Sequence, residues 1–241
     1  MSGHSKWKTI KNKKAVTDAK KSGIFTKLAN IVTVTAREKG ADPDMNSSLR
    51  AAIIKARSFN MPKENIERAI KKGSSDSEEK LERIIYEGYG PEKSAMLIET
   101  ITNNKNRTNQ ELKALLSKNG GSFAQKGSVM WLFDKLGKIT IEKDDQMNIE
   151  KIELEAIDAG AKDISEEYDI ITILTLPEEL FKTTKILEEK NIKIKDVEID
   201  YIAKNPIIIS NPTTKENIER IFELIDENDD VQNVYSNIEF V

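Results

Sequence analysis

The stretch KITIEKDDQMNIEKIELEAIDAG, residues 138–160, decides the fold of the second half of the chain. It predicts a strand over 138–142 and a helix over 148–159 that ends at Gly160, because glycine readily adopts the left-handed backbone that closes a helix. Further along, the apolar pattern predicts two strands ending at residue 176, a helix from Pro177 to about residue 189, and a strand over 192–202. This β-α-β-β-α-β order is ferredoxin-like.

The segments on either side of this unit each look incomplete as ferredoxin-like domains. Residues 80–135 predict two strands, a helix and a further strand over 128–133, and residues 205–241 predict a strand, a helix and a strand. Capping boxes that begin at Thr108 and Thr213 indicate the helix starts. Joined, the two segments would complete a second two-layer α/β domain. We therefore predict one domain from 80–135 plus 205–241, with residues 136–204 inserted in it.

The N-terminal part predicts a small helical domain over residues 1–75. Within residues 47–59 one face of the helix is apolar, and its members are Leu49, Ala52, Ile53, Ala56 and Phe59. Gly23 divides a very basic segment from one that carries apolar residues, and Gly73 is expected to follow the last helix, which starts near Pro62. The predicted fold class is thus α+β, a helical N-terminal domain followed by two ferredoxin-like two-layer α/β domains, one inserted in the other.

The charge of the chain is divided between its ends. Residues 1–72, the basic head, hold 17 Lys and Arg against 6 Asp and Glu, whereas the remaining residues, the acidic body, hold 21 against 35. A concentrated basic surface is typical of proteins that bind polyphosphates. The candidate nucleic-acid contacts in the head are His4, Lys6, Trp7, Lys8, Lys11, Lys13, Lys14, Lys20, Lys21, Lys27, Arg50, Lys55 and Arg57.

Other interpretations of the basic head are weaker. A solvated lysine face is the usual meaning of a charge run, but Asp18 is the only acidic residue before Glu38. An anionic membrane surface would require bulky apolar residues opposite the lysines, and these are scarce between residues 6 and 21. Trp7 could stack on an unpaired base or rest on the core. Nucleic acid is therefore the preferred partner.

A second candidate contact lies in the acidic body, in the polar loop 102–108. Lys105 and Arg107 flank the predicted start of a helix, whose free N–H groups favour an anion. An ordinary amide-rich loop that caps its helix through Thr108 explains the same residues. Both interpretations stay open.

Several classes of chemistry are excluded or disfavoured. The chain has no cysteine and a single histidine, which removes disulfides, thiolate nucleophiles and transition-metal sites. Residues 88–94 imitate a phosphate-binding loop and residues 226–237 a calcium loop, but each lacks required residues. We predict no catalytic residue, metal, cofactor or small-molecule substrate. No signal peptide or membrane-spanning stretch is evident, so we expect a cytoplasmic protein without a membrane partner.

Short motifs along the whole sequence resemble those of the YebC/PmpR family. They include GHSKW (3–7), LRAAI (49–53), NMPK (60–63), YEGYGP (86–91) and GSV (127–129). The chain departs from the family pattern at Asn103, where an aspartate is usual, and at Lys93 and Ala124, where glycine is usual. The resemblance implies a helical N-terminal domain plus two α/β domains and a cytoplasmic regulator of gene expression.

Three functional hypotheses remain. The first, which the resemblance implies, is a DNA-binding transcriptional regulator. The second, which relatives that include a mitochondrial translational activator imply, is a translation factor that binds ribosomal RNA. In the first, the acidic body is expected to repel a duplex, so that only the basic head touches it. In the second, the acidic body would face basic ribosomal proteins. An enzyme is the weakest hypothesis, because the paired carboxylates do not face each other across a cleft.

Overall fold

The computed structural model describes residues 18–75, 81–144, 147–167 and 169–241, and the side chains of these residues except those of 18–22 and 47. The chain divides into two compact units, one of Met1–Phe133 with Ile202–Val241 and the other of Asp134–Tyr201. The second unit is therefore an insertion in the first. The finer division into three domains stays a prediction.

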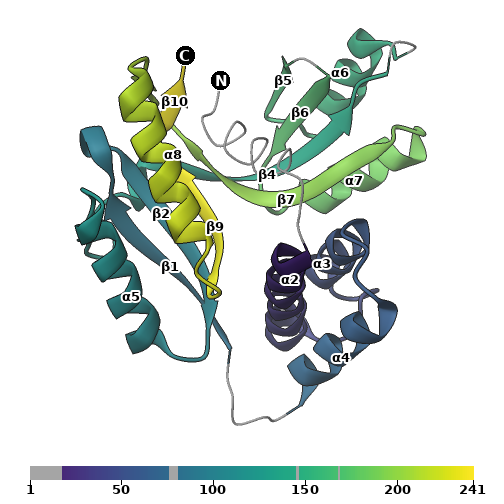
Figure 1. Cartoon of the computed structure of the whole chain (residues 1–241). Coiled ribbons are helices and arrows are strands. Elements are labelled where there is room, and N and C mark those ends of the chain that lie inside the picture. Colours follow the sequence, from purple (N-terminus) through teal and green to yellow (C-terminus); the bar gives the residue numbers. More distant parts are fainter. Residues whose placement is uncertain (1–17, 76–80, 145–146, 168) are drawn as a thin grey trace. The chain divides into compact units, whose positions relative to one another are not determined.

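Three helices make up the described N-terminal part, namely α2 (Asp18–Lys39), α3 (Ser47–Ser58) and α4 (Lys63–Ser74) (Figure 1). Their shared core contains Leu28, Val32, Leu49, Ala56 and Ile66, among others. The apolar face predicted for residues 47–59 is buried as far as Ala56, whereas Phe59 is 39% exposed because α3 has already ended at Ser58. The helical arrangement follows from the 3.6-residue apolar period.

Two glycines of the head lie inside helices, and for Gly73 this differs from the expectation. Gly23 lies inside α2, which continues through it. Gly73 lies inside α4, where a Cβ atom would stand 2.4 Å from the backbone oxygen of Thr33 and 2.8 Å from the Cβ of Ala36. Glycine is therefore needed at position 73 because α2 and α4 approach closely there, and not because a helix ends.

The α/β part of the first unit is a sheet covered by two helices on one face (Figure 1). The sheet has the order β3-β1-β2-β9, and β8 and β10 form a separate parallel pair. Leu112 and Leu116 of α5 share a core with Ile218 and Phe222 of α8. The elements are β1 (Glu82–Tyr89), η1 (Pro91–Lys93), β2 (Ala95–Thr102), α5 (Lys105–Lys118), β3 (Ser122–Ala124), η2 (Met130–Leu132), β8 (Ile207–Ile209), α8 (Pro212–Asp226), β9 (Val231–Ser236) and β10 (Ile238–Phe240).

The helix starts in this part differ from the predicted capping boxes. The side chains of Asn104 and Asn211 accept the hydrogen bonds that open α5 and α8, so both helices begin before the threonines at 108 and 213. Asparagine caps a helix as well as threonine does, and it stands earlier in each run. The strand predicted over 128–133 is instead a turn followed by η2, because buried Glu87 binds the backbone N–H groups of this segment.

The inserted unit has the predicted ferredoxin-like order. It consists of β4 (Phe133–Glu142), α6 (Ile149–Asp158), β5 (Asp163–Glu167), β6 (Ile170–Thr175), α7 (Leu180–Glu189) and β7 (Ile194–Ala203). The sheet order is β5-β6-β4-β7, and Ile139 and Ile173 pack with Leu180 and Leu187 of α7 in its core. The α+β class, a helical N-terminal region followed by sheet domains, is confirmed.

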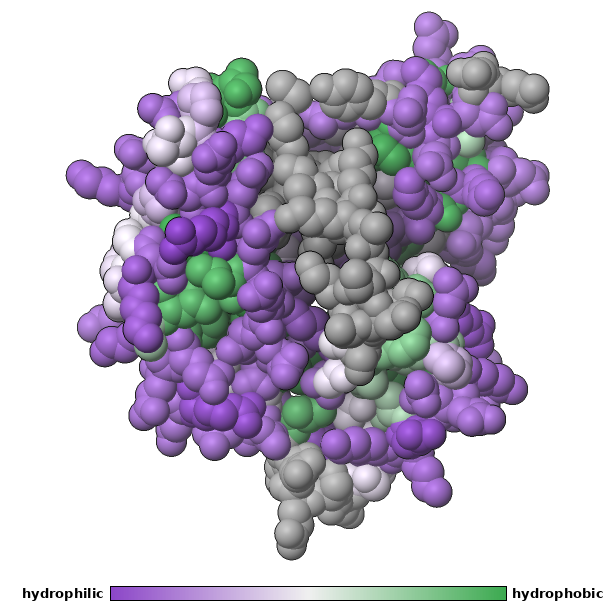
Figure 2. Space-filling model, in the orientation of Figure 1, coloured by the Kyte–Doolittle hydropathy of each residue, from purple (hydrophilic) through white to green (hydrophobic). Residues whose placement is uncertain are grey.

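Hydrophilic side chains cover most of the face drawn in Figure 2, where apolar residues form small separate patches. No helix in the described ranges is long and apolar enough to cross a bilayer. Within the same ranges, no group of three or more His, Asp or Glu side chains is placed to hold a metal ion.

Candidate nucleic-acid interface

Much of the predicted interface lies near the N-terminus. His4, Lys6, Trp7, Lys8, Lys11, Lys13 and Lys14 lie outside the described residues. Lys20 and Lys21 belong to the first turn of α2, but their side chains are not described. These contacts therefore stay predictions from charge and sequence.

Three of the predicted contacts in the head, Arg50, Lys55 and Arg57, lie on α3. Arg50 and Arg57 are exposed, seven residues apart, and Ile54 lies between them on the same face and is 57% exposed. The guanidinium of Arg50 donates to the backbone oxygens of Pro43, at 3.1 Å, and Asp44, at 2.9 Å. Lys55 is half-buried on the same helix. The outer face of α3 thus presents two guanidinium groups around an apolar side chain.

Lys27 makes an internal contact. Its Nζ donates to the backbone oxygen of Asp226 at 2.5 Å and stands 3.6 Å from the carboxylate of the same residue. Asp226 is the last residue of α8, and a cation is favoured at that end of a helix by the backbone dipole. Only 16% of the Lys27 side chain is exposed. The structure therefore gives Lys27 a role in packing against α8.

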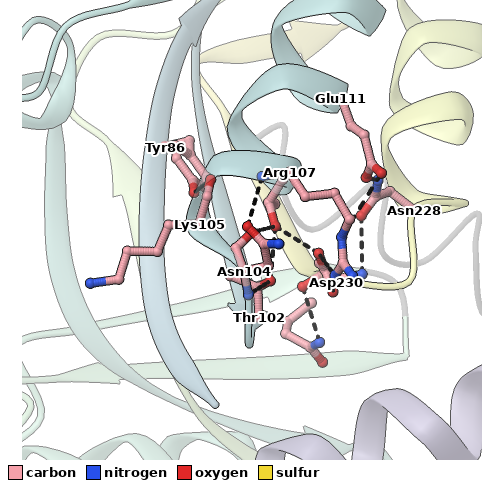
Figure 3. A network of polar contacts seen from close by, with 10 residues as sticks. Tyr86, Thr102, Asn104, Lys105, Arg107, Glu111, Asn228 and Asp230 are labelled. Atoms are coloured by element: carbon pink, nitrogen blue, oxygen red, sulfur yellow. Dashed lines mark hydrogen bonds and ion pairs between the residues drawn. The ribbon is translucent and has the colours of Figure 1, made fainter. Parts of the chain in front are cut away.

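At the start of α5 an internal carboxylate stands where an anion was expected (Figure 3). The side chain of Asn104 accepts from the N–H of Arg107 and caps the helix. Asp230 accepts from the Arg107 guanidinium at 2.8 and 3.0 Å and from the Thr108 hydroxyl at 2.7 Å. Thr108 also donates within the loop, so the terminus is satisfied by the chain itself. This geometry favours the interpretation as a capped, amide-rich loop.

The two cations of this loop also have acidic neighbours. Lys105 pairs with Glu82 at 2.5 Å, and Arg107 lies 3.9 Å from Glu111. The hydrogen bonds and charge of Asp230 raise the pKa of Arg107, which stays charged. Lys105 and Arg107 thus both lie at the start of α5, and each is paired with a carboxylate of the chain.

Sequence reasoning missed a buried carboxylate that shapes the loop before β4. Glu87 of β1 is 3% exposed and accepts three backbone N–H groups, from Gly127 at 2.5 Å, Val129 at 2.7 Å and Met130 at 2.9 Å. Burial acts to raise the pKa of Glu87, but the three N–H groups and the charge of Lys126 outweigh it and lower the pKa. A glutamate in the middle of a strand is the only sequence signal for this contact.

Comparison with known proteins places the chain in a family. Models of the TACO1/YebC protein N-terminal domain and of the TACO1/YebC second and third domain match residues 5–76 and 81–238. A "probable transcriptional regulatory protein" of Thermoanaerobacter pseudethanolicus is 46% identical over 99% of this chain and 97% of its own length. One of the same description from Thermotoga maritima is 45% identical over 99% of this chain and 94% of its own length.

A solved structure agrees over most of the fold. The crystal structure of a conserved hypothetical protein from Aquifex aeolicus is similar with a TM-score of 0.85 and 35% sequence identity, and the match covers 93% of this chain and 92% of that one. The family models together cover both the helical head and the α/β body. The chain therefore belongs to the TACO1/YebC family.

Proposed function

We propose that this chain is a cytoplasmic, nucleic-acid-binding regulator of gene expression, a DNA-binding transcriptional regulator whose basic head contacts phosphates. The observation that carries the proposal is the charge division, with 17 basic against 6 acidic residues in positions 1–72. The relatives, which are named probable transcriptional regulatory proteins, support the same function. No catalytic residue, metal or cofactor is part of the proposal.

The head would bind mainly by releasing the counterions of the phosphate chain, because its candidate contacts are lysines and arginines rather than base-reading amides. The outer face of α3 offers Arg50 and Arg57 for this purpose. Lys6, Lys8, Lys11, Lys13, Lys14, Lys20 and Lys21 supply further charge from the sequence before residue 22. Binding through such groups depends strongly on salt and weakly on base sequence.

The test measures the affinity of the full chain for duplex DNA by fluorescence anisotropy at several salt concentrations. Lys13→Ala, Lys20→Ala and Arg57→Ala should each weaken binding to all duplex sequences about equally. Each should also reduce the slope of log K against log[salt] by roughly one. Lys185→Ala is the matched control, because Lys185 is an exposed lysine of the inserted unit. Unchanged affinity and slope in all three head variants would refute the phosphate contacts.

A parallel experiment separates DNA from the ribosome as target. Crosslinking in cells, followed by sequencing of the bound DNA and RNA, should recover DNA fragments if the head acts on transcription. Co-sedimentation with ribosomes at low salt, combined with no affinity for duplex DNA, would contradict the DNA-binding proposal. Ribosomal RNA and basic ribosomal proteins would then be the partners.

A further inference from the structure

Trp131 is an exposed aromatic residue, and the single polar group of its side chain already makes a hydrogen bond within the chain. The side chain lies in η2 and is 65% exposed. Its Nε1–H donates to the backbone oxygen of Ser128 at 2.9 Å. The indole therefore has no remaining hydrogen-bond donor, and the surface that it leaves to solvent is the apolar ring. Tryptophan is enriched at interfaces, where its ring supplies a large apolar contact area.

The backbone around Trp131 is fixed from two sides. On one side Glu87 holds the N–H groups of Gly127, Val129 and Met130. On the other, the backbone N–H of Lys204 donates to the oxygen of Leu132 at 2.9 Å. The Nζ of Lys204 donates to the backbone oxygen of Trp131 itself at 3.0 Å. A ring presented on so constrained a backbone loses little conformational entropy when a partner stacks on it.

The sequence on the N-terminal side of Trp131 is unusual in an acidic body because it lacks acidic residues, and the first one after it is Asp134, which is partly buried. Residues 112–133 contain no Asp or Glu but hold Lys113, Lys118 and Lys126. Residues 202–215 likewise contain no Asp or Glu, and they hold two lysines, at 204 and 215. The contacts of Lys204 join these two stretches at Trp131. The carboxylate of Glu87 beneath the loop is buried, and both of its oxygens accept backbone N–H groups.

We propose that Trp131, with Lys126 and Lys204, forms a stacking site for an unpaired nucleobase, a second nucleic-acid contact outside the basic head. An aromatic ring beside cations is the chemistry that holds single-stranded nucleic acid, where the base stacks and the lysines meet the phosphates. The inference rests on the proposed function and extends it. The ligand is single-stranded, because the bases of an intact duplex are stacked on each other.

The first test compares Trp131→Ala and Trp131→Phe in the full chain, using a single-stranded oligonucleotide of mixed sequence. Loss of the ring should weaken binding about tenfold, whereas phenylalanine, which keeps a ring, should stay within about threefold of the wild type. Lys126→Ala should weaken binding and lower the salt slope, and Lys185→Ala is its control. Equal affinity of wild type and Trp131→Ala would overturn the proposal.

A fluorescence experiment detects the stacking itself. The chain has two tryptophans, so in a Trp7→Phe background all the indole emission comes from Trp131. The oligonucleotide should quench this emission, whereas an abasic oligonucleotide with the same number of phosphates should not. Quenching by neither oligonucleotide would refute stacking.

The result also separates this inference from the proposed function. If the chain binds no nucleic acid at low salt, the proposed function itself fails. If binding persists but Trp131→Ala leaves affinity and emission response unchanged, only the stacking site fails. If Trp131→Ala alters only the oligomeric state, the ring contacts a second copy of the chain, and the nucleobase proposal is wrong.

Discussion

Replacing Glu87 by glutamine should destabilise the loop that carries Trp131. The carboxylate accepts through Oε1 from Gly127 and through Oε2 from Val129 and Met130. A glutamine that keeps its oxygen at the Oε2 position preserves two bonds and turns an NH2 group towards the N–H of Gly127. One hydrogen bond to a charged acceptor is lost, which costs about 1.5–3 kcal/mol of the free energy of unfolding.

Chemical denaturation followed by circular dichroism measures this loss. Glu216→Gln is the matched control, because Glu216 is exposed on α8 and the same change there should stay within about 0.5 kcal/mol of wild type. Hydrogen exchange should show faster exchange of the amides of Gly127, Val129 and Met130 in Glu87→Gln. A variant as stable as the control, with those amides still protected, would refute the role of the carboxylate.

The same residue predicts a dependence on pH. The folded chain lowers the pKa of Glu87 below its ordinary value of 4.5, so the unfolded chain binds the proton more readily. The stabilisation is therefore present above pH 4.5 and is lost as the pH falls through the folded pKa. The difference in unfolding free energy between wild type and Glu87→Gln should shrink on acidification below this value. A difference that stays constant down to pH 3 would contradict the lowered pKa.

Three further predictions concern packing and charge. Gly73→Ala should destabilise the chain by about 1–3 kcal/mol, because α2 leaves no room for a methyl group. Gly23→Ala should stabilise it by about 0.5–1 kcal/mol, because the new methyl group meets nothing within 4 Å inside α2. Thermal denaturation of both variants measures the two changes. Asp230→Asn should lower the free energy of unfolding by about 1–3 kcal/mol, measured in urea, because the start of α5 loses its charged partner. Lys138→Met should lower the free energy of unfolding by about 3–5 kcal/mol, because it leaves the buried carboxylate of Asp200 without its cation. Adding Asp200→Leu to Lys138→Met should restore most of this stability, which denaturation of the double variant measures.

Periodicity predicted the elements well because it reports burial directly. The apolar face of residues 47–59 and the strand expected over 138–142 correspond to α3 and β4. Helix starts were less accurate, because Asn104 and Thr108 are both competent caps and lie in one polar run. One glycine was misassigned for a different reason. Gly73 is required by the neighbouring helix α2, and no local pattern within α4 carries that information.

For the candidate site, the sequence predicted the concentration of basic residues but not the contacts that they make. Arg107 and Asp230 are separated by 123 residues, and Glu87 reaches amides about 40 residues away, so neither contact leaves a pattern within a sequence window. Lys27 was grouped with the phosphate contacts because it is basic, yet its partner is the end of α8. A count of charges identifies the basic head but not which of its members are occupied internally.

The same limit applies to the acidic body, whose 21 basic and 35 acidic residues suggested that it would repel nucleic acid. Charges on a protein surface act over about 8 Å at physiological ionic strength, so a phosphate responds to its neighbours rather than to the total. Around Trp131, residues 112–133 and 202–215 carry five lysines and no Asp or Glu, and the nearest carboxylate in sequence, that of Asp134, is partly buried. An acidic average is therefore compatible with a local cationic site, and raising the salt concentration should weaken binding at Trp131 as well as at the head.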